Sequence, residues 1–293
     1  TIILCFMTFL PFIGEERNGA RRWIKLPLLG TFQPSEIAKF TIVLFLANFF
    51  DKKHDVLKES GFNIGQAVVG LFFTVLLVFL QDDFSTAFFI MLVGLLMFFV
   101  AGIKLGWFLG FCVFSLPIVI LFIFTESYRV KRLIAFFNPE QYSHGVNYQI
   151  NASCRAISSG GFWGSGFGSG LKKVTGIPEV QADFIFAGWT EAMGFLGVIL
   201  FFALIFYFAW RGYKIAFRCE DKFRSYTAFG IITSIVLQTL LNCGVVCGAL
   251  PATGIPLPFF SSGGSSLIIT LLMCGVVINI SKFDNNNLEL YNE

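Results

Sequence analysis

Charged residues are scarce in this sequence. Asp, Glu, Lys and Arg make up only 13% of its 293 residues, whereas hydrophobic residues make up 56%. Because a soluble globular domain is about a quarter charged, this composition excludes an ordinary soluble protein and indicates an integral membrane protein. The formal net charge of +3 is also too small to suggest a nucleic-acid partner.

Metal-binding and redox motifs are absent as well. Only 2 histidines occur, His54 and His144, too few for a histidine-based metal centre. The 7 cysteines are scattered without a Cys-x-x-Cys pair, and most lie in apolar runs. We therefore expect neither a disulfide framework nor a metal site.

Nucleotide-binding motifs are not found either. The glycine-rich segment 160–170 matches neither the GxGxxG pattern nor a Walker loop, and no strand is predicted before it. Its glycines are expected instead to let the backbone approach a ligand or the membrane closely.

What the sequence has in abundance is long apolar runs. Polar breaks separate eight of them, which predict helices near residues 1–13, 34–50, 64–80, 84–103, 106–125, 184–210, 226–250 and 264–281. The first is too short to span a bilayer, so we interpret it as the end of a helix and the chain as a fragment. The predicted fold class is all-α, a polytopic helical bundle in a membrane.

The longest polar segment, residues 126–183, lies between the fifth and sixth predicted helices. Loops of roughly 60 residues are uncommon unless they have a function of their own. Glu179 and Asp183 end this loop at the start of an apolar run, where a charge costs up to about 2.5–3.5 kcal/mol. These carboxylates therefore mark a function, or alternatively they complement the dipole of the helix that follows.

The basic residues suggest an orientation. Lys and Arg are shared equally between two sets of loops, but one set is much shorter, and short loops are the ones to which the positive-inside rule applies. We therefore place the short loops, which include Lys52, Lys104 and Arg211, in the cytoplasm and the loop 126–183 outside. The external loops then carry more base than orientation requires, which favours an anionic ligand.

Four motifs follow one another along the chain. They are Gly19-Ala20-Arg21-Arg22-Trp23-Ile24 with Gln33-Pro34-Ser35-Glu36 and Lys39; Gln81-Asp82-Asp83-Phe84-Ser85-Thr86; Tyr148-Gln149, Gly160-Gly161 and Pro178-Glu179 with Asp183-Phe184-Ile185-Phe186-Ala187; and Pro256-Leu257-Pro258-Phe259-Phe260-Ser261-Ser262-Gly263-Gly264-Ser265-Ser266. Together they resemble the SEDS family, the FtsW, RodA and SpoVE peptidoglycan glycosyltransferases of bacterial membranes. The resemblance covers essentially the whole chain, and its specificity lies in the combination of the motifs.

The chain departs from the family pattern at several positions. The departures are Gln181-Ala182 for the usual His-Thr before the aspartate, Ala192 for the usual second acid after Glu191, Asp82 and Ser85 for the usual proline and glycine of the second motif, and Ser262 for the usual tyrosine of the last. Because Glu179 and Asp183 are retained, these changes bear on substrate positioning rather than on activity.

Two features bear on the branch of the family. The Gly166-x-Gly168-x-Gly170 run followed by Lys172-Lys173 resembles the division branch, FtsW, whereas Thr253-Gly254-Ile255-Pro256 is similar to the elongation type. We favour the division branch.

The resemblance implies a ten-helix fold of which the first two helices are missing here, leaving about eight in one membrane domain, residues 1–293. It places the chain in the cytoplasmic (inner) membrane, with the loop 126–183 and the active face outside. The implied activity is polymerisation of lipid II into glycan strands during division or elongation. The implied partners are lipid II, the growing strand, a class B penicillin-binding protein and other proteins of the division or elongation complex. A lipid II flippase and a non-catalytic division scaffold are the alternatives.

By the same resemblance, Asp183 aligns with the aspartate that the family requires, and we expect it to be the general base of an inverting displacement. Glu179 would orient the sugar or tune Asp183. The other candidate substrate-binding residues are Arg21, Arg22, Lys172, Lys173, Gln33 and Ser265. The arginines could hold a diphosphate in a bidentate manner or snorkel at the interface. The lysines could do the same or meet anionic headgroups, and Ser265 could serve helix packing instead.

Three charged residues inside predicted helices are expected to have structural or tuning roles. Glu36 and Lys39 are three residues apart on one helix face, so an internal ion pair is preferred to direct catalysis. Glu191 should face the bundle interior. No cofactor is implied with certainty: Asp83 is expected to cap the next helix, and the alternative is a divalent cation held between Asp83 and a diphosphate.

Overall fold

The computed structural model describes residues 1–10, 13–17, 20–26, 30–59, 64–138, 147–166 and 181–290. The chain forms two compact units. The first comprises Thr1–Val113, Ala209–Ile235 and Gly264–Glu293, and the second comprises Phe114–Phe208 and Val236–Gly263. The boundaries fall inside three helices, so each of these helices contributes residues to both units.

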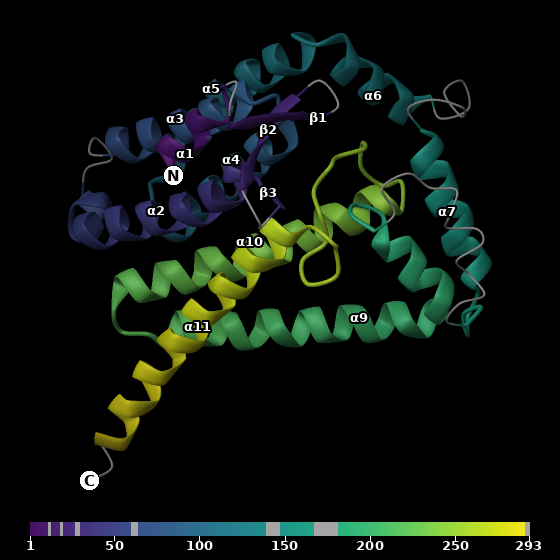
Figure 1. Ribbon diagram of the computed structural model, residues 1–293. Coiled ribbons are helices and arrows are strands. Elements are labelled where there is room, and N and C mark those ends of the chain that lie inside the picture. The colour runs from purple at the N-terminus through teal and green to yellow at the C-terminus, as the bar shows by residue number, and fades with distance from the viewer. Residues whose placement is uncertain are drawn as a thin grey trace. The chain divides into compact units, whose positions relative to one another are not determined.

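Helices make up most of the described chain (Figure 1). They are α1 (Ile2–Met7), α2 (Pro34–Glu59), α3 (Gly65–Leu80), α4 (Phe84–Val100), α5 (Leu105–Phe124), α6 (Ser127–Phe137), α7 (Tyr148–Gly160), α9 (Ile185–Arg218), α10 (Lys222–Val246) and α11 (Gly264–Leu290). Each of the predicted apolar runs overlaps one of these helices, which confirms the polytopic helical bundle. The first is much shorter than its run, because α1 has only 6 residues.

Three helices in the described part of the chain are long and apolar enough to cross a membrane, namely Ile185–Arg218, Lys222–Val246 and Gly264–Phe283. Shorter apolar helices cover Gly65–Leu80, Phe84–Val100 and Ser115–Phe124. Large apolar side chains on α9 point away from the protein, for example Leu204 and Phe206, which are 60% and 73% exposed. Such a surface is stable against lipid, whose tails are equally apolar.

The first unit is built on close helix contacts. A Cβ added at Gly94 of α4 would lie 2.5 Å from Leu71 of α3, and one added at Gly230 of α10 would lie 2.5 Å from Val43 of α2. Small residues at these points let the helices approach one another, as in other membrane bundles. Phe50 of α2 is completely buried, with aromatic neighbours from α4 and α10. These contacts join α2, α3, α4 and α10 into one packed group.

The all-α prediction missed a small sheet in the first unit. Its strands β1 (Gly14–Arg17), β2 (Ala20–Leu26) and β3 (Gly30–Phe32) pair in this order, both pairs antiparallel. Along β2, Ala20 and Ile24 are buried, Arg22 and Trp23 are half-buried, and Arg21 and Lys25 are exposed. The pairing of β1 with β2 shifts register between Glu15 and Glu16, which face Trp23 and Arg21, so that Arg22 is an extra residue in β2. The two candidate arginines therefore lie at an irregularity of the sheet.

The second unit contains α6 and α7, which lie within the segment predicted as one long loop. Ser153 of α7 donates a hydrogen bond to the carbonyl of Val246 at the end of α10, 2.8 Å away. Asn147, at the start of α7, donates to the carbonyl of Ala135 in α6. The buried apolar core of this unit is formed by Ile150, Ala156, Phe184, Phe186, Ala187, Phe201, Cys243, Val246 and Leu257. The polar segment is thus anchored on α10 through α7, and α6 is held by the start of α7.

Helix α9 is interrupted at Gly194, whose φ of 62° and ψ of −161° lie outside the helical region. The segment 160–166, which follows α7, supplies hydrogen bonds at the interruption. The amide of Phe195 donates to the carbonyl of Gly161 at 3.0 Å, and the amide of Ser165 donates to the carbonyl of Glu191 at 2.9 Å. The backbone groups freed by the break are therefore paired, as a membrane environment requires.

Glycines make this contact sterically feasible. A Cβ at Gly164 would lie 2.2 Å from the carbonyl oxygen of Ala192, and one at Gly194 would lie 2.3 Å from the amide nitrogen of Gly164. The sequence predicted that the glycine-rich segment approaches a ligand or the membrane. Within residues 160–166 the glycines let the segment approach the backbone of α9, and an approach to a ligand or the membrane stays a prediction. Gly168 and Gly170 lie outside the described residues.

Candidate functional site

Asp183 lies two residues before α9, in the second unit. Phe184, the residue after it, is only 2% exposed and belongs to the apolar core of this unit. The side chain of Asp183 is half-buried. The amide of Ala187 donates to the carbonyl of Phe184 at 3.0 Å, so the first helical turn is formed immediately after Asp183. The candidate base therefore stands on a short, anchored segment at the start of a helix, as predicted from the sequence.

Three successive peptide carbonyls in this segment are held by donors from elsewhere in the second unit. The carbonyl of Gln181 accepts from the amide of Ser262 at 2.9 Å. The carbonyl of Ala182 accepts from the hydroxyl of Ser261. The carbonyl of Asp183 accepts from the side-chain amide of Asn242, 2.8 Å away. We call these three hydrogen bonds the carbonyl clamp.

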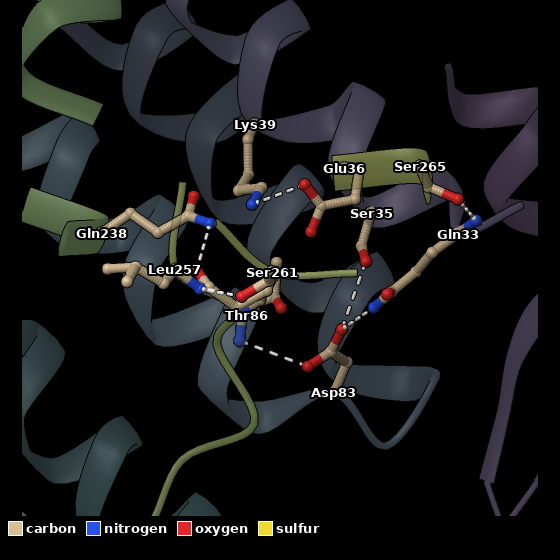
Figure 2. Close-up of polar contacts among 11 residues, drawn as sticks. Gln33, Ser35, Glu36, Lys39, Asp83, Thr86, Gln238, Leu257, Ser261 and Ser265 are labelled. Atoms are coloured by element: carbon tan, nitrogen blue, oxygen red, sulfur yellow. Dashed lines mark hydrogen bonds and ion pairs between the residues drawn. The ribbon is translucent and has the colours of Figure 1, made fainter. Parts of the chain in front are cut away.

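The segment 247–263, between α10 and α11, forms the other side of the clamp. The Nδ2 of Asn242 also donates to the carbonyl of Ile255, and Nε2 of Gln238 donates to the carbonyl of Pro256, both at 2.8 Å. The amide of Leu257 donates to Oγ of Ser261 at 2.6 Å (Figure 2). A single helix, α10, thus fixes this segment through two side-chain amides one helical turn apart.

Two further residues connect the segment 247–263 with the site. Gly254 borders the carboxylate, since a Cβ added there would lie 3.5 Å from Oδ2 of Asp183. Arg132 of α6 donates from Nη1 to the carbonyl of Ala252 at 2.9 Å. The polar region after α5 therefore reaches the segment that borders Asp183.

Glu191 is buried, as expected, and is only 1% exposed. Its Oε1 accepts a hydrogen bond from the hydroxyl of Ser159 at 3.2 Å. Its Oε2 is buried without a hydrogen-bond partner in the described part of the chain. The partner that sequence could not name is thus Ser159 of α7, close to the interruption of α9.

In the first unit, Asp83 caps α4. Its Oδ1 accepts from the amide of Thr86 at 3.3 Å, and its Oδ2 accepts from Nε2 of Gln33 at 2.7 Å and from the hydroxyl of Ser35 at 3.2 Å (Figure 2). Asp83 is only 3% exposed. Three donors therefore occupy this buried carboxylate, which favours the predicted helix cap over a cation ligand.

Gln33 and Ser265, both candidates for substrate binding, contact each other. The amide of Gln33 donates to Oγ of Ser265, whose hydroxyl donates to the carbonyl of Thr31, both at 3.3 Å. Ser265 opens α11 and is 7% exposed. These bonds join α11 to β3 and to the start of α2, so packing accounts for the position of both side chains.

Glu36 and Lys39 form the internal ion pair that their spacing suggested. Nζ of Lys39 lies 2.8 Å from Oε2 of Glu36, and both side chains are only 4% exposed. Nζ also lies 5.4 Å from the centroid of the Phe89 ring. A pair this deep is costly to break, since removing one partner leaves an uncompensated charge, at about 3–5 kcal/mol.

Arg21 and Arg22 of β2 have different partners. Arg21 forms an exposed ion pair with Glu16 on β1, with 3.2 Å between Nε and Oε2. Arg22 is half-buried and donates to the carbonyl of Asp82 in the turn before α4. The structure therefore gives each arginine a protein partner of its own.

Other predicted residues fall outside the described chain. Glu179, Lys172 and Lys173 lie in the segment 167–180. Among the described residues, no three His, Cys, Asp or Glu side chains gather in a way that could hold a metal ion.

Sequence reasoning missed Asn242 and Gln238, the residues that hold the segment next to Asp183. A signal for them was present, because two amides spaced by four residues interrupt the apolar run 226–250. Polar side chains inside a membrane helix face the protein interior and find partners there. Both residues are buried, with exposed fractions of 2% and 3%.

Comparison with known proteins agrees with the sequence motifs. The family model for FtsW, RodA and SpoVE, described as "Cell cycle protein", matches residues 1–286. The chain is 40% identical over 283 residues to the probable peptidoglycan glycosyltransferase FtsW of Geobacter sp. (strain M18), covering 96% of this chain and 76% of that protein. It is 35% identical over 286 residues to stage V sporulation protein E of Bacillus subtilis (strain 168), covering 96% and 78%.

Solved structures share the fold. One, from a study of the structural coordination of polymerization and crosslinking by a peptidoglycan synthase complex, matches with a TM-score of 0.76 and 26% identity, covering 96% of this chain and 78% of that one. The crystal structure of the rod shape determining protein RodA of Thermus thermophilus matches with a TM-score of 0.68 and 24% identity, covering 96% and 75%. The chain therefore belongs to the FtsW/RodA/SpoVE family of polytopic membrane proteins.

Proposed function

We propose that this protein is a peptidoglycan glycosyltransferase that polymerises lipid II, with Asp183 as the general base. Family membership and the names of the relatives, which are at least a third identical to this chain, support the activity. The observation that carries the catalytic assignment is the carbonyl clamp: a half-buried carboxylate stands on a backbone segment whose three successive carbonyls are all fixed. A base must be held within hydrogen-bond reach of the proton that it takes.

The proposed reaction is one displacement with inversion. The 4-hydroxyl oxygen of the acceptor sugar forms a bond to the anomeric carbon of the donor, while the bond from that carbon to the diphosphate oxygen breaks. The hydroxyl proton passes to the carboxylate of Asp183, and the electron pair of the broken bond leaves with the lipid diphosphate. An α-linked donor gives a β-linked glycan in this way, without a covalent enzyme intermediate.

The leaving diphosphate requires positive charge or N–H donors. Arg21 and Arg22 on β2 and Lys172 and Lys173 in the polar loop are the proposed sources, and Glu179 is proposed to orient the sugar or tune Asp183. Arg22 donates one hydrogen bond to the carbonyl of Asp82, but its Nε is buried without a partner among the described residues. Gln33 and Ser265 could reach substrate only if they exchange the bonds that join β3 to α11, so they are the weakest members of the proposed set.

The site is proposed to face the outside of the cytoplasmic membrane, with the turn between α9 and α10 in the cytoplasm. Lys222, Arg224, Arg218 and Lys214 gather around that short turn, as the positive-inside rule expects of a cytoplasmic loop. The proposed partner is a class B penicillin-binding protein, which would cross-link the strands made here. One of the similar solved structures concerns a peptidoglycan synthase complex that coordinates polymerization and crosslinking, which supports such a pairing.

The test is synthesis of glycan from lipid II by the purified protein, with and without Asp183. Asp183→Asn keeps the shape of the side chain, but an amide cannot accept the acceptor proton at neutral pH. A positioned base contributes about 100- to 10,000-fold, so polymerisation should fall by that factor while lipid II binding and association with the transpeptidase persist. Asp183→Glu should recover little, since a displacement of about 1 Å can cost about 100-fold.

Asp221→Asn is the matched control. Asp221 caps α10 through the amide of Arg224 at 2.8 Å, is exposed, and Asn caps a helix as well as Asp does. Polymer formation at the parent rate by Asp183→Asn would exclude Asp183 as the base. A flippase would continue to move lipid II across the membrane in this variant, and a scaffold would be indifferent to it.

A further inference from the structure

Asn242 occupies an unusual position for an amide side chain. It lies inside the apolar helix α10 and is only 2% exposed. Its Nδ2 carries two hydrogens, and both are used, one by the carbonyl of Asp183 and one by the carbonyl of Ile255, each at 2.8 Å. Rotating the amide by half a turn would place Oδ1 against these two carbonyl oxygens. The orientation of the side chain is therefore dictated by its two partners.

Both partners are connected with the Asp183 carboxylate. One is the carbonyl of Asp183 itself, which fixes the peptide plane beside the Cα that bears the carboxylate. The other belongs to Ile255, the neighbour of Gly254, which borders Oδ2. A single side chain thus sets both the backbone that carries the candidate base and the backbone next to its carboxylate oxygen.

Stability alone does not explain this arrangement well. A buried amide stabilises a protein only when its polar groups are satisfied, yet Oδ1 of Asn242 is buried without a partner in the described chain. The nearby core is already formed by apolar side chains such as Phe184, Val246 and Leu257. Ser261 strengthens the same segment, since its hydroxyl donates to the carbonyl of Ala182 while its Oγ accepts from the amide of Leu257.

We propose that Asn242 is a positioning residue for Asp183, holding the carboxylate and the bordering segment in the geometry that proton transfer requires, and that Ser261 acts in the same way on the preceding peptide. This inference rests on the proposed function. Neither residue needs to touch substrate; both act through the backbone of Asp183. Loss of either should lower kcat far more than it weakens lipid II binding, because misplacement of a catalytic group by about 1 Å costs about 100-fold.

The experiment uses the full chain, reconstituted with lipid II, and the variants Asn242→Leu and Ser261→Ala. Asn242→Leu removes both donors at similar volume, whereas Ser261→Ala removes one hydroxyl and is the milder change if the first variant folds poorly. Ser261→Thr keeps the hydroxyl and should retain activity. Ser153→Ala is the matched control, since it removes a buried side-chain donor to a carbonyl of the same unit, that of Val246, which is not part of the carbonyl clamp.

The decisive readout is the combination with Asp183→Asn. If Asn242 and Ser261 act through Asp183, the substitution of either residue lowers kcat about 10- to 100-fold in the parent. The same substitution has no further effect in the Asp183→Asn background, because the effects of residues that act as a unit are not additive. KM and the lipid II dissociation constant should stay within about twofold of the parent values. Because a loss of folded protein would also leave both values unchanged, kcat is expressed per folded molecule.

Two results would overturn the inference: a kcat per folded molecule in both variants equal to that of Ser153→Ala, or equal losses in the parent and in the Asp183→Asn background. Failure of the parent protein to make polymer is a different outcome. It would refute the proposed function and this inference with it.

Discussion

Gly194→Ala tests the interruption of α9, the least expected feature of the fold. The backbone at this position has φ 62° and ψ −161°, which glycine tolerates and other residues avoid. An added Cβ would lie 2.3 Å from the amide nitrogen of Gly164 and 2.7 Å from the carbonyl oxygen of Phe162. Both neighbours are backbone atoms, so no side chain can rotate away to relieve the clash.

The cost can be estimated from these two effects. A non-glycine residue in a sparsely populated backbone region costs about 1–3 kcal/mol. Forcing an extra methyl group into a close-packed contact costs about 1–3 kcal/mol more. The free energy of unfolding of Gly194→Ala should therefore fall by about 2–6 kcal/mol, or else the segment 160–166 should leave α9 and break its hydrogen bonds to Glu191 and Ala192.

Thermal unfolding of the purified protein in detergent measures the first outcome, and hydrogen exchange at residues 160–166 measures the second. Gly275→Ala is the control, because Gly275 lies inside α11 and an added Cβ there meets no atom within 4 Å. This control should be neutral or more stable by up to about 1 kcal/mol. Equal unfolding midpoints and equal exchange in the two variants would refute the described contact between 160–166 and α9.

Two further predictions concern the substrate and the membrane. Changing Arg21 and Arg22 together to Gln should weaken lipid II binding by about 10-fold or more, as expected for loss of charge-assisted hydrogen bonds. Lys at both positions should restore only part of the binding, since it cannot form a bidentate contact. Unchanged binding in the Gln variant would favour interfacial snorkelling. In a background without native cysteines, Asn138→Cys after α6 should react with a membrane-impermeant reagent in intact spheroplasts, whereas Glu220→Cys between α9 and α10 should react only after lysis. The reverse labelling pattern would contradict the proposed orientation and an outward-facing site.

The membrane helices could be predicted from the sequence because a long apolar run is itself the signal of a membrane helix. The run 64–80 became α3 (Gly65–Leu80), and the run 84–103 became α4 (Phe84–Val100). Where a predicted helix boundary differs from the observed one, the cause lies in the residues at that boundary. The run 226–250 became α10 (Lys222–Val246), because charged residues can open a helix at an interface and because residues 247–250 are apolar without being helical.

The sheet and the broken helix could not be read from hydropathy. Strand β1 is polar and has only 4 residues, and β2 mixes charged with apolar residues, although Asn18-Gly19 between them is a dipeptide typical of tight hairpins. That dipeptide lies outside the described residues. The interruption of α9 depends on hydrogen bonds from a segment that is distant in the sequence, as the contact between Gly164 and Gly194 shows. Apolar periodicity carries no information about such a contact.

The candidate site was likewise predicted only in part. Asp183 was identified through a motif, and the ion pair between Glu36 and Lys39 through helical spacing. The carbonyl clamp was not identified, because its acceptors are main-chain groups that every residue possesses. Only the donors leave a mark in the sequence, as Asn242 in an apolar run and as Ser261 in a serine-rich stretch, and neither mark says which carbonyl is bound.

Five of the departures from the family pattern contribute backbone groups to hydrogen bonds. These are Asp82, Gln181, Ala182, Ala192 and Ser262. Gln181 and Ala182 offer carbonyls to the clamp, and Ser262 offers its amide. The carbonyl of Ala192 accepts from the amide of Gly166, and that of Asp82 accepts from Arg22.

A changed side chain leaves such a bond in place as long as the backbone keeps its path. Asp82 shows the limit of this argument. Its φ of 59° is out of reach for the proline usual at this position, whose ring holds φ near −65°, so the turn before α4 must follow a path of its own in this chain. The carbonyl of Asp82 is also the one that holds Arg22. The turn residue and the arginine are therefore coupled, and a proline at position 82 should release the guanidinium from its present partner.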